Sequence, residues 1–201
     1  TNVYNHKAFE EYCAKELAEC TTNALFVMLD IDDFKMINDT QGHAVGDMVL
    51  SQTGSILSEV TGDRGIVGRL GGDEFAVFAS GFQNSVEMEE FCVSLRENLK
   101  KIIFDMEYSV SIGAAKLDGR RISFPDFYYE ADRAVYAAKR GGKNRIVFYD
   151  QIKENQEPDH VLRYVGDLHG DLQKEKGENI VQYPQIMLSF VPTTIKRFIT
   201  I

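Results

Sequence analysis

The chain has 201 residues, of which 44% are hydrophobic and 26% charged, and its net charge is -9. These proportions are typical of a globular protein with one full core, and the acidic balance excludes a surface built to bind a nucleic-acid backbone, which needs clustered lysine and arginine. A mononucleotide site is not excluded, because a metal ion and one or two cations can bind its phosphates locally.

The chain shows no sign of export or of membrane insertion. Cys13, Cys20 and Cys92 lack metal-ligand spacing, and their odd number favours reduced thiols. No apolar run approaches the ~20 residues of a membrane span, and the beginning does not resemble a signal peptide. We therefore expect a cytoplasmic domain without membrane contact. Because the chain begins at Thr1 inside what looks like a motif, we expect the chain to be part of a longer protein.

Helical and extended patterns alternate along the first 150 residues. Residues 7–20 place apolar side chains on one helical stripe. The run ALFVMLDI (residues 24–31) predicts a strand buried on both faces, with Asp30 at its C-terminal end. We then expect a short helix, a longer helix, two hairpin strands, a helix, a strand, a helix and a last strand at residues 34–38, 44–60, 65–70, 74–79, 85–103, 108–117, 124–140 and 145–149.

The order β-α-β-β-α-β within this series predicts a mixed α/β (α+β) fold. Its sheet would have an antiparallel core flanked by helices, as in ferredoxin-like, polymerase-palm or nucleotidyl-cyclase-like folds. After Asp150 the polar segment QIKENQEPDH is typical of a linker. We expect one domain over residues 1–150, and a linker and C-terminal tail without an assignable fold over residues 151–201.

Acidic residues stand where the predicted sheet turns. Asp30 ends the first strand, and Asp73 and Glu74 occupy the hairpin more than forty residues later, at the same edge. Clustered carboxylates repel one another unless a cation neutralises them, and oxygen ligands suit Mg²⁺ or Mn²⁺. Gly71 and Gly72 would let the backbone approach a ligand closely. Each feature alone is more often a plain hairpin or a helix cap, but together they favour a metal–phosphate site.

Two motifs give the sequence a family resemblance. Residues 29–47 (LDIDDFKMINDTQGHAVGD) and 69–75 (RLGGDEF) resemble the GGDEF family of diguanylate cyclases, and the similarity runs from TNVYNHKAF through SIGAA and ADRAVYAAKRGGKNRIVFYD to about residue 150. The resemblance implies that two GTP molecules are joined into cyclic di-GMP with release of pyrophosphate, supported by two Mg²⁺ or Mn²⁺ ions per active site. Because one domain would hold one GTP, it also implies a twofold-symmetric homodimer, and a sensor domain before Thr1.

The resemblance implies roles in metal binding and catalysis for five positions. Asp30, the carbonyl of Ile31 and Asp73 would bind the metals. Either Asp73 or Glu74 could help to deprotonate the attacking 3′-hydroxyl. Lys35 would counter the charge that develops on the transferring phosphorus.

Further matched residues would hold the nucleotide. Asn38 and Asp47 would read guanine, because a carboxylate accepts from the ring N1–H and the exocyclic amine, so we expect GTP over ATP. His43 would line the pocket wall, with a packing histidine as an equal alternative.

The phosphates would lie against backbone amides and lysines. The amides near Phe34 open a helix, and Gly71 and Gly72 belong to the same substrate site. Lys139 and Lys143 would reach the terminal phosphates, although cations at a helix end also have a purely structural explanation in the helix dipole.

The sequence departs from the family pattern in three respects. Gly62 and Gly65 stand where the family commonly has the Arg-x-x-Asp of its inhibitory site, so we predict no product inhibition through that site. Lys143 replaces a common arginine, which exchanges a forked group for a point charge. His6 replaces an arginine of the opening motif.

Three alternative functions stay open. The domain could bind GTP or cyclic di-GMP as a catalytically silent regulatory module. The segment YVGDLHGD (residues 164–171) is similar to the metallophosphatase motif in which Asp167 and His169 would bind metal, but the further ligands of that fold do not follow it. A hybrid cyclic dinucleotide is a third product, against which Asp47 argues.

Overall fold

The computed structural model describes residues 3–19, 22–100 and 108–152. In chain order its elements are β1 (Tyr4–Asn5), α1 (His6–Glu19), β2 (Asn23–Ile31), α2 (Phe34–Gln41), α3 (His43–Thr61), the 3-10 turn η1 (Gly62–Arg64), β3 (Gly65–Gly71), β4 (Glu74–Phe82), α4 (Ser85–Leu99), β5 (Val110–Leu117), α5 (Phe124–Arg140), β6 (Ile146–Phe148) and the 3-10 turn η2 (Tyr149–Gln151). Every predicted helix and strand has a counterpart among them, whereas β1, η1 and η2 were not predicted. No helix of this part of the chain has the length and apolar character that crossing a bilayer requires.

The strands form one sheet in the order β1-β3-β4-β2-β5-β6. Its four central strands, β3, β4, β2 and β5, pair antiparallel, and the edge strands β1 and β6 pair parallel to their neighbours. The predicted fold with an antiparallel core is therefore confirmed. Because β2 lies at the centre, eight of its nine residues are buried, which explains its continuous apolar sequence.

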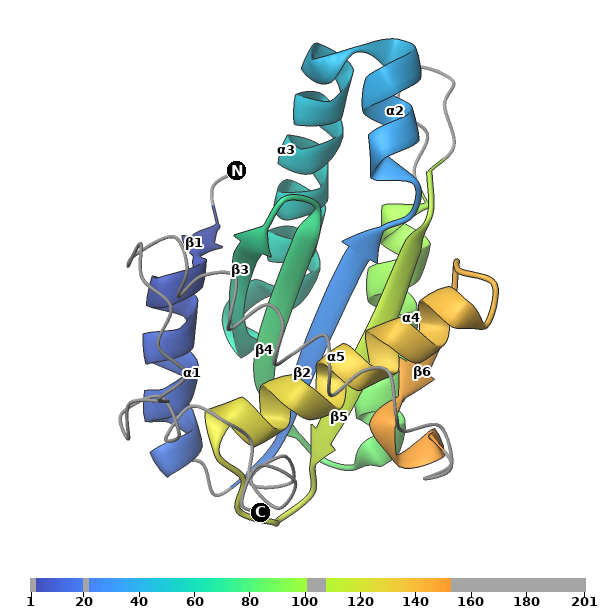
Figure 1. The fold of residues 1–201 in the computed structure, drawn as a ribbon. Coiled ribbons are helices and arrows are strands. Elements are labelled where there is room, and N and C mark those ends of the chain that lie inside the picture. The colour runs from blue at the N-terminus through green and yellow to red at the C-terminus, as the bar shows by residue number, and fades with distance from the viewer. Residues whose placement is uncertain (1–2, 20–21, 101–107, 153–201) are drawn as a thin grey trace, which may run out of the picture. The chain divides into compact units, whose positions relative to one another are not determined.

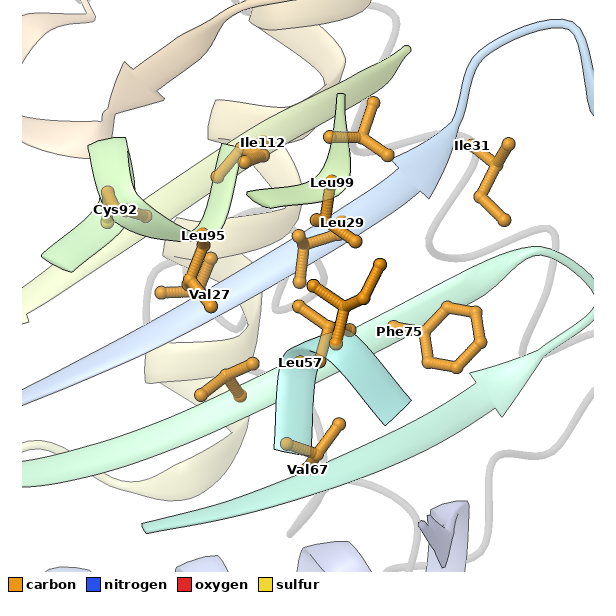
Figure 2. Close-up of a cluster of buried hydrophobic side chains, with 14 of the residues drawn as sticks. Val27, Leu29, Ile31, Leu57, Val67, Phe75, Cys92, Leu95, Leu99 and Ile112 are labelled. Carbon is orange, nitrogen blue, oxygen red and sulfur yellow. The ribbon is translucent and has the colours of Figure 1, made fainter. Parts of the chain in front are cut away.

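Helices cover both faces of the sheet (Figure 1). On one face, odd-numbered residues of β2 such as Val27 and Leu29 pack against Leu57 of α3 and Leu95 of α4 (Figure 2). On the other face, even-numbered residues such as Phe26 pack against α1 and α5. Each large apolar side chain buried in this way stabilises the fold by about 1.5–3 kcal/mol.

Helix α5 lies unusually close to the sheet at Gly113 of β5. A Cβ atom at this position would lie 2.1 Å from the backbone nitrogen of Val135 and 2.4 Å from the carbonyl oxygen of Ala131. Only glycine permits this contact. It fixes the distance of α5 from the sheet, and the C-terminal end of α5 therefore stays beside the end of β2.

Some sequence predictions fall outside the described residues. These are the linker and tail at residues 153–201, with the YVGDLHGD segment and its Asp167 and His169, and Cys20. The predicted helix at residues 85–103 ends at Leu99, and its last three predicted positions lie in the range that is not described. The division into a domain of residues 1–150 and a tail stays a prediction.

Candidate active site

The acidic residues of the two motifs meet at one edge of the sheet. Asp30 and Glu74 are direct neighbours in the β2–β4 register, and both continue the even-numbered series that faces α5. Asp73 lies in the adjoining turn, and its carbonyl oxygen accepts a hydrogen bond of 3.4 Å from the backbone nitrogen of Ile31. The structure thus brings together side chains more than forty residues apart, as the predicted topology requires.

Burial and mutual repulsion act on these acids together. Burial is the main cause that raises the pKa of the Asp30 carboxyl, and the nearby charges of Asp73 and Asp32 raise it further, while Lys139 opposes them. Burial also raises the pKa of Glu74, followed by the charge of Asp30. Carboxylates in this environment gain from a neighbouring cation.

Lys139 supplies positive charge to this cluster. Its Nζ atom lies 2.5 Å from Oδ2 of Asp30, and the two side chains are 31% and 9% exposed. Lys139 projects from the last turn of α5. The lysine that the sequence assigns to a phosphate thus contacts a predicted metal ligand, and its role toward phosphate stays a prediction.

The oxygen donors at this edge suit a hard divalent ion, although the described residues do not form a preassembled metal site. Among the described residues, no three His, Cys, Asp or Glu side chains form a ready metal site. Asp30 and Asp73 offer carboxylate oxygens, and Ile31 can offer only its carbonyl because its side chain packs in the core on the opposite face. Such oxygens are the ligands that Mg²⁺ and Mn²⁺ prefer. In this structure Lys139 pairs with Oδ2 of Asp30, which is an oxygen that such an ion would bind.

The helix α2 begins directly beside these acids. Its N-cap residue, Asp33, has a left-handed backbone and makes no capping hydrogen bond with its side chain. The Asp33 carboxylate instead pairs with Lys143, whose Nζ lies 2.6 Å from Oδ1. Phe34 and Lys35 are the first two residues of the helix. Their backbone N–H groups therefore have no acceptor within the helix, as at any helix start. Lys35 is exposed.

The predicted guanine-reading residues lie where α2 and α3 pack together. A Cβ atom on Gly46 of α3 would lie 1.9 Å from Oδ1 of Asn38 and 3.3 Å from the ring of Phe34. Asp47 follows Gly46 directly, and it is exposed, as is His43 in the first turn of α3. An exposed His43 is not a packing histidine, which removes that alternative. The contact of Gly46 with Asn38 was not predicted; a glycine inside a helix was its only sequence signal.

The hairpin turn is open on its outer side. Cβ atoms added at Gly71 or Gly72 would meet nothing within 4 Å, and Gly72 has a φ of 36°. Arg69 of β3 holds the turn through hydrogen bonds of 3.0 and 2.6 Å from Nε and Nη2 to the Gly72 carbonyl. The turn therefore has room for a ligand and a fixed backbone. The sequence analysis had not assigned a role to Arg69.

The positions of the missing inhibitory motif have a structural explanation. At Gly65 a Cβ atom would lie 1.8 Å from the carbonyl oxygen of Phe78, so this backbone has no room for an aspartate there. Gly62 has a left-handed φ of 52°. The nearby Arg64 pairs with Glu87 at 2.7 Å. The absence of product inhibition through that site stays a prediction.

Asp32 and Asn144 also lie at this site, although the sequence analysis gave them no role. Asp32 is buried and accepts three hydrogen bonds, one of them of 3.0 Å from the Asn144 amide. The sequence signal for Asp32 was its position two residues after Asp30, which places both acids on the same side of the chain.

Comparison with known proteins identifies the family to which this chain is similar. The model of the family described as "Diguanylate cyclase, GGDEF domain" matches residues 1–145. The Escherichia coli (strain K12) protein named "Probable diguanylate cyclase DgcT" is 28% identical over 166 residues, which cover 79% of this chain and 36% of that protein. Diguanylate cyclase A of Treponema denticola is 36% identical over 126 residues, which cover 60% and 33%. The chain spans about a third of the length of these relatives.

Solved structures show the same fold. The GGDEF domain of DgcB from Caulobacter crescentus, in complex with c-di-GMP, is 31% identical with a TM-score of 0.70, and the match covers 75% of this chain and 94% of that one. The active GGEEF domain of a diguanylate cyclase from Vibrio cholerae is 25% identical with a TM-score of 0.68, and the match covers 75% and 100%. With its core motifs, its fold and a family match over most of its length, the chain belongs to the GGDEF family of diguanylate cyclase domains.

Proposed function

We propose that this domain is an active diguanylate cyclase that condenses two GTP molecules into cyclic di-GMP. The observation that carries the proposal is the meeting of Asp30, Asp73 and Glu74 at one edge of the sheet, beside Lys139 and Lys143. Two oppositely charged sets of side chains at one edge are what a metal-bound triphosphate needs. All the acids that the family resemblance assigns to the reaction are present, which favours activity over the silent alternative.

The reaction would be a reciprocal transfer of two nucleotidyl groups. The 3′-hydroxyl oxygen of one GTP forms a bond to the α-phosphorus of the other, the bond to pyrophosphate breaks, and the hydroxyl proton goes to a base. When bound by Asp30, Asp73 and the Ile31 carbonyl, Mg²⁺ or Mn²⁺ would supply polarisation of the α-phosphate and a lower pKa of the hydroxyl. Burial raises the pKa of Glu74, which brings this carboxyl toward the range that suits a general base.

The lysines would change partner when nucleotide binds. Lys139 and Lys143 pair with Asp30 and Asp33 in this structure, and both would turn to the phosphates once GTP and metal are present. Lys35, exposed at the start of α2, would face the charge on the transferring phosphoryl group. The exchange keeps the charges of the site balanced in both states.

Guanine would lie between α2 and α3. Asn38 already rests on Gly46, and Asp47 next to it would accept from the guanine N1–H and exocyclic amine. Adenine does not present these two donors together. His43 would line the same pocket. This arrangement supports GTP over ATP in both halves of the product, and therefore argues against a hybrid dinucleotide.

The assembly would be a homodimer with twofold symmetry. One domain offers one nucleotide site, so two sites must face each other for reciprocal attack. We propose further that the domain comprises residues 1–150, that residues 151–201 are a linker and tail, and that a cytoplasmic parent protein places a sensor domain before it.

The proposal is tested by incubating the full chain with GTP and Mg²⁺ over a series of protein concentrations, and by identifying the products by mass. We expect cyclic di-GMP and pyrophosphate, at a rate that rises more than linearly with protein concentration, and no product from Asp73→Ala. Asp63→Ala, at an exposed acid of η1, is the matched control and should match the native rate. GTP binding without any product, even at high concentration, would favour the silent module, and adenine incorporation from a GTP–ATP mixture would contradict the guanine assignment.

A further inference from the structure

We propose that Asp32 is a positioning residue of this site: it holds the loop that carries Lys143 against the end of β2 that carries Asp30. The inference rests on the proposed function and adds to it a residue that contacts neither metal nor nucleotide. Asp32 would fix the distance between the metal ligands and the cation that binds the terminal phosphates.

The Asp32 carboxylate joins three segments of the chain. The residue is 6% exposed, and its carboxylate accepts hydrogen bonds of 2.6 Å from the hydroxyls of both Ser109 and Ser111. A third bond, of 3.0 Å, comes from the backbone amide of Asn144. The backbone nitrogen of Asp32 also donates to the carbonyl of Ser109 at 2.9 Å. The end of β2, the start of β5 and the loop between α5 and β6 thus share one buried anion.

The backbone at this junction is strained. In the part of the chain that the structure describes, the non-glycine residues with positive φ are Asp33, Lys143 and Asn144, at 56°, 63° and 46°. All three lie at the contact between the β2 end and the α5–β6 loop. Such conformations persist only where the surroundings impose them, and they gather at functional sites. The bond from Asn144 to Asp32 is a contact between the two segments that helps to impose them here.

The loop has other contacts, but these hold it to itself, to α5 and to β5, where the backbone nitrogen of Ile112 donates to the carbonyl of Arg145 at 2.9 Å. The amide of Lys143 donates to the carbonyl of Ala138 at 3.1 Å, and Nε of Arg145 donates to the carbonyl of Lys143 at 3.1 Å. The Lys143–Asp33 pair does reach α2, but it would open when Lys143 turns to phosphate. In the nucleotide-bound state, therefore, Asp32 would remain as the buried link between this loop and the end of β2.

This arrangement makes a prediction that a merely structural role would not. If Asp32 only stabilised the fold, its loss would weaken the binding of every nucleotide alike. If it positions Lys143, its loss should weaken contacts to the terminal phosphates and spare those to guanine, which come from α2 and α3. A ligand that lacks the β- and γ-phosphates separates the two cases.

The experiment compares two nucleotides on Asp32→Ala, which removes the acceptor of all three hydrogen bonds, in the full chain by calorimetry. 3′-Deoxy-GTP with Mg²⁺ has the triphosphate but no attacking hydroxyl, so it cannot react, and GMP lacks the two terminal phosphates. We expect the Kd of 3′-deoxy-GTP to rise at least about tenfold and that of GMP to stay within about twofold. Asp63→Ala, at an exposed acid of η1, should leave both constants unchanged.

A second measurement follows the bond itself. By NMR, hydrogen exchange of the Asn144 amide should accelerate at least about tenfold in Asp32→Ala, while amides in α3 keep the native rate. Should Asp32→Ala fail to fold, Ser111→Ala removes one of the three hydrogen bonds and should give the same selective loss, about threefold.

An equal loss for both nucleotides, no loss for either, or unchanged exchange at Asn144 would overturn the role of Asp32. Failure of the native chain to bind 3′-deoxy-GTP would instead overturn the proposed function, and the inference with it.

Discussion

Replacing Lys139 by methionine removes the cation beside Asp30 and keeps much of the side-chain volume. Asp30 is 9% exposed at its side chain and Lys139 is 31% exposed, so the pair lies between a buried and a surface ion pair. Breaking a fully buried pair costs about 3–5 kcal/mol, and an exposed pair contributes about 0–1 kcal/mol. We therefore expect Lys139→Met to lower the free energy of unfolding by about 1–3 kcal/mol, and Tm by about 2–10 °C for a chain of this size.

The pH dependence of this loss follows from the acid that Lys139 neutralises. The pKa of Asp30 is already raised above its unfolded value by burial, and removal of Lys139 raises it further. A group with a raised folded pKa binds more protons in the folded state, so its ionisation destabilises the fold as pH rises. The difference in Tm between native chain and variant should therefore be largest near pH 8 and shrink as pH falls toward the ordinary range of a carboxyl.

Metal should compensate for the missing lysine. In the variant, Asp30 is free to bind a divalent ion without competition, so the gain in Tm on adding Mg²⁺ should exceed that of the native chain. The assay is differential scanning calorimetry at pH 5 and pH 8, with and without Mg²⁺. Lys100→Met, which breaks the exposed pair with Glu97, is the matched control and should shift Tm by no more than about 2 °C. Equal losses in both variants, or a smaller Mg²⁺ gain in Lys139→Met, would refute this reasoning.

Three further predictions concern packing. Gly113→Ala should lower the free energy of unfolding by about 1–3 kcal/mol or more because the added Cβ meets the α5 backbone, whereas Gly71→Ala, where the Cβ meets nothing within 4 Å, should change it little; urea unfolding measures both. Gly46→Ala should displace the Asn38 side chain and weaken GTP binding about tenfold or more, and calorimetry showing native affinity would contradict this. Burial raises the pKa of Cys92 to about 12, so this thiol should resist a thiol-specific reagent at pH 8 until the chain unfolds, as peptide mass mapping will show.

The order of elements could be predicted because each has a strong local pattern. The β2 run from Ala24 to Leu29 is apolar throughout, which is typical of a strand buried on both faces. The Gly-Gly-Asp turn marked the hairpin. The edge strand β1 was not predicted because its two residues, Tyr4 and Asn5, are too few to show a periodic pattern. Its pairing with β3 is a tertiary contact, which no local pattern records.

The candidate site was predictable in part for the same reason. Strand topology alone was enough to bring Asp30 and Glu74 together, because a hairpin and its neighbouring strand share an edge. The partners of Lys139 and Asp32 were not predictable. They depend on the close approach of α5 to the sheet at Gly113 and on the path of the loop after Arg140. Distances between side chains from separate elements follow from packing, which single-sequence patterns do not encode.

The central claim is that Asp30 and Asp73 hold divalent ions at the edge of the sheet, between the acids and the triphosphate. The most direct test is a crystal structure of the full chain with 3′-deoxy-GTP and Mn²⁺, in which anomalous scattering locates the metal. We predict two Mn²⁺ peaks within coordination distance of the Asp30 and Asp73 carboxylates, with Lys139 turned from Asp30 to the phosphates. Mn²⁺ bound elsewhere, or Lys139 still paired with Asp30 beside a bound nucleotide, would contradict the account.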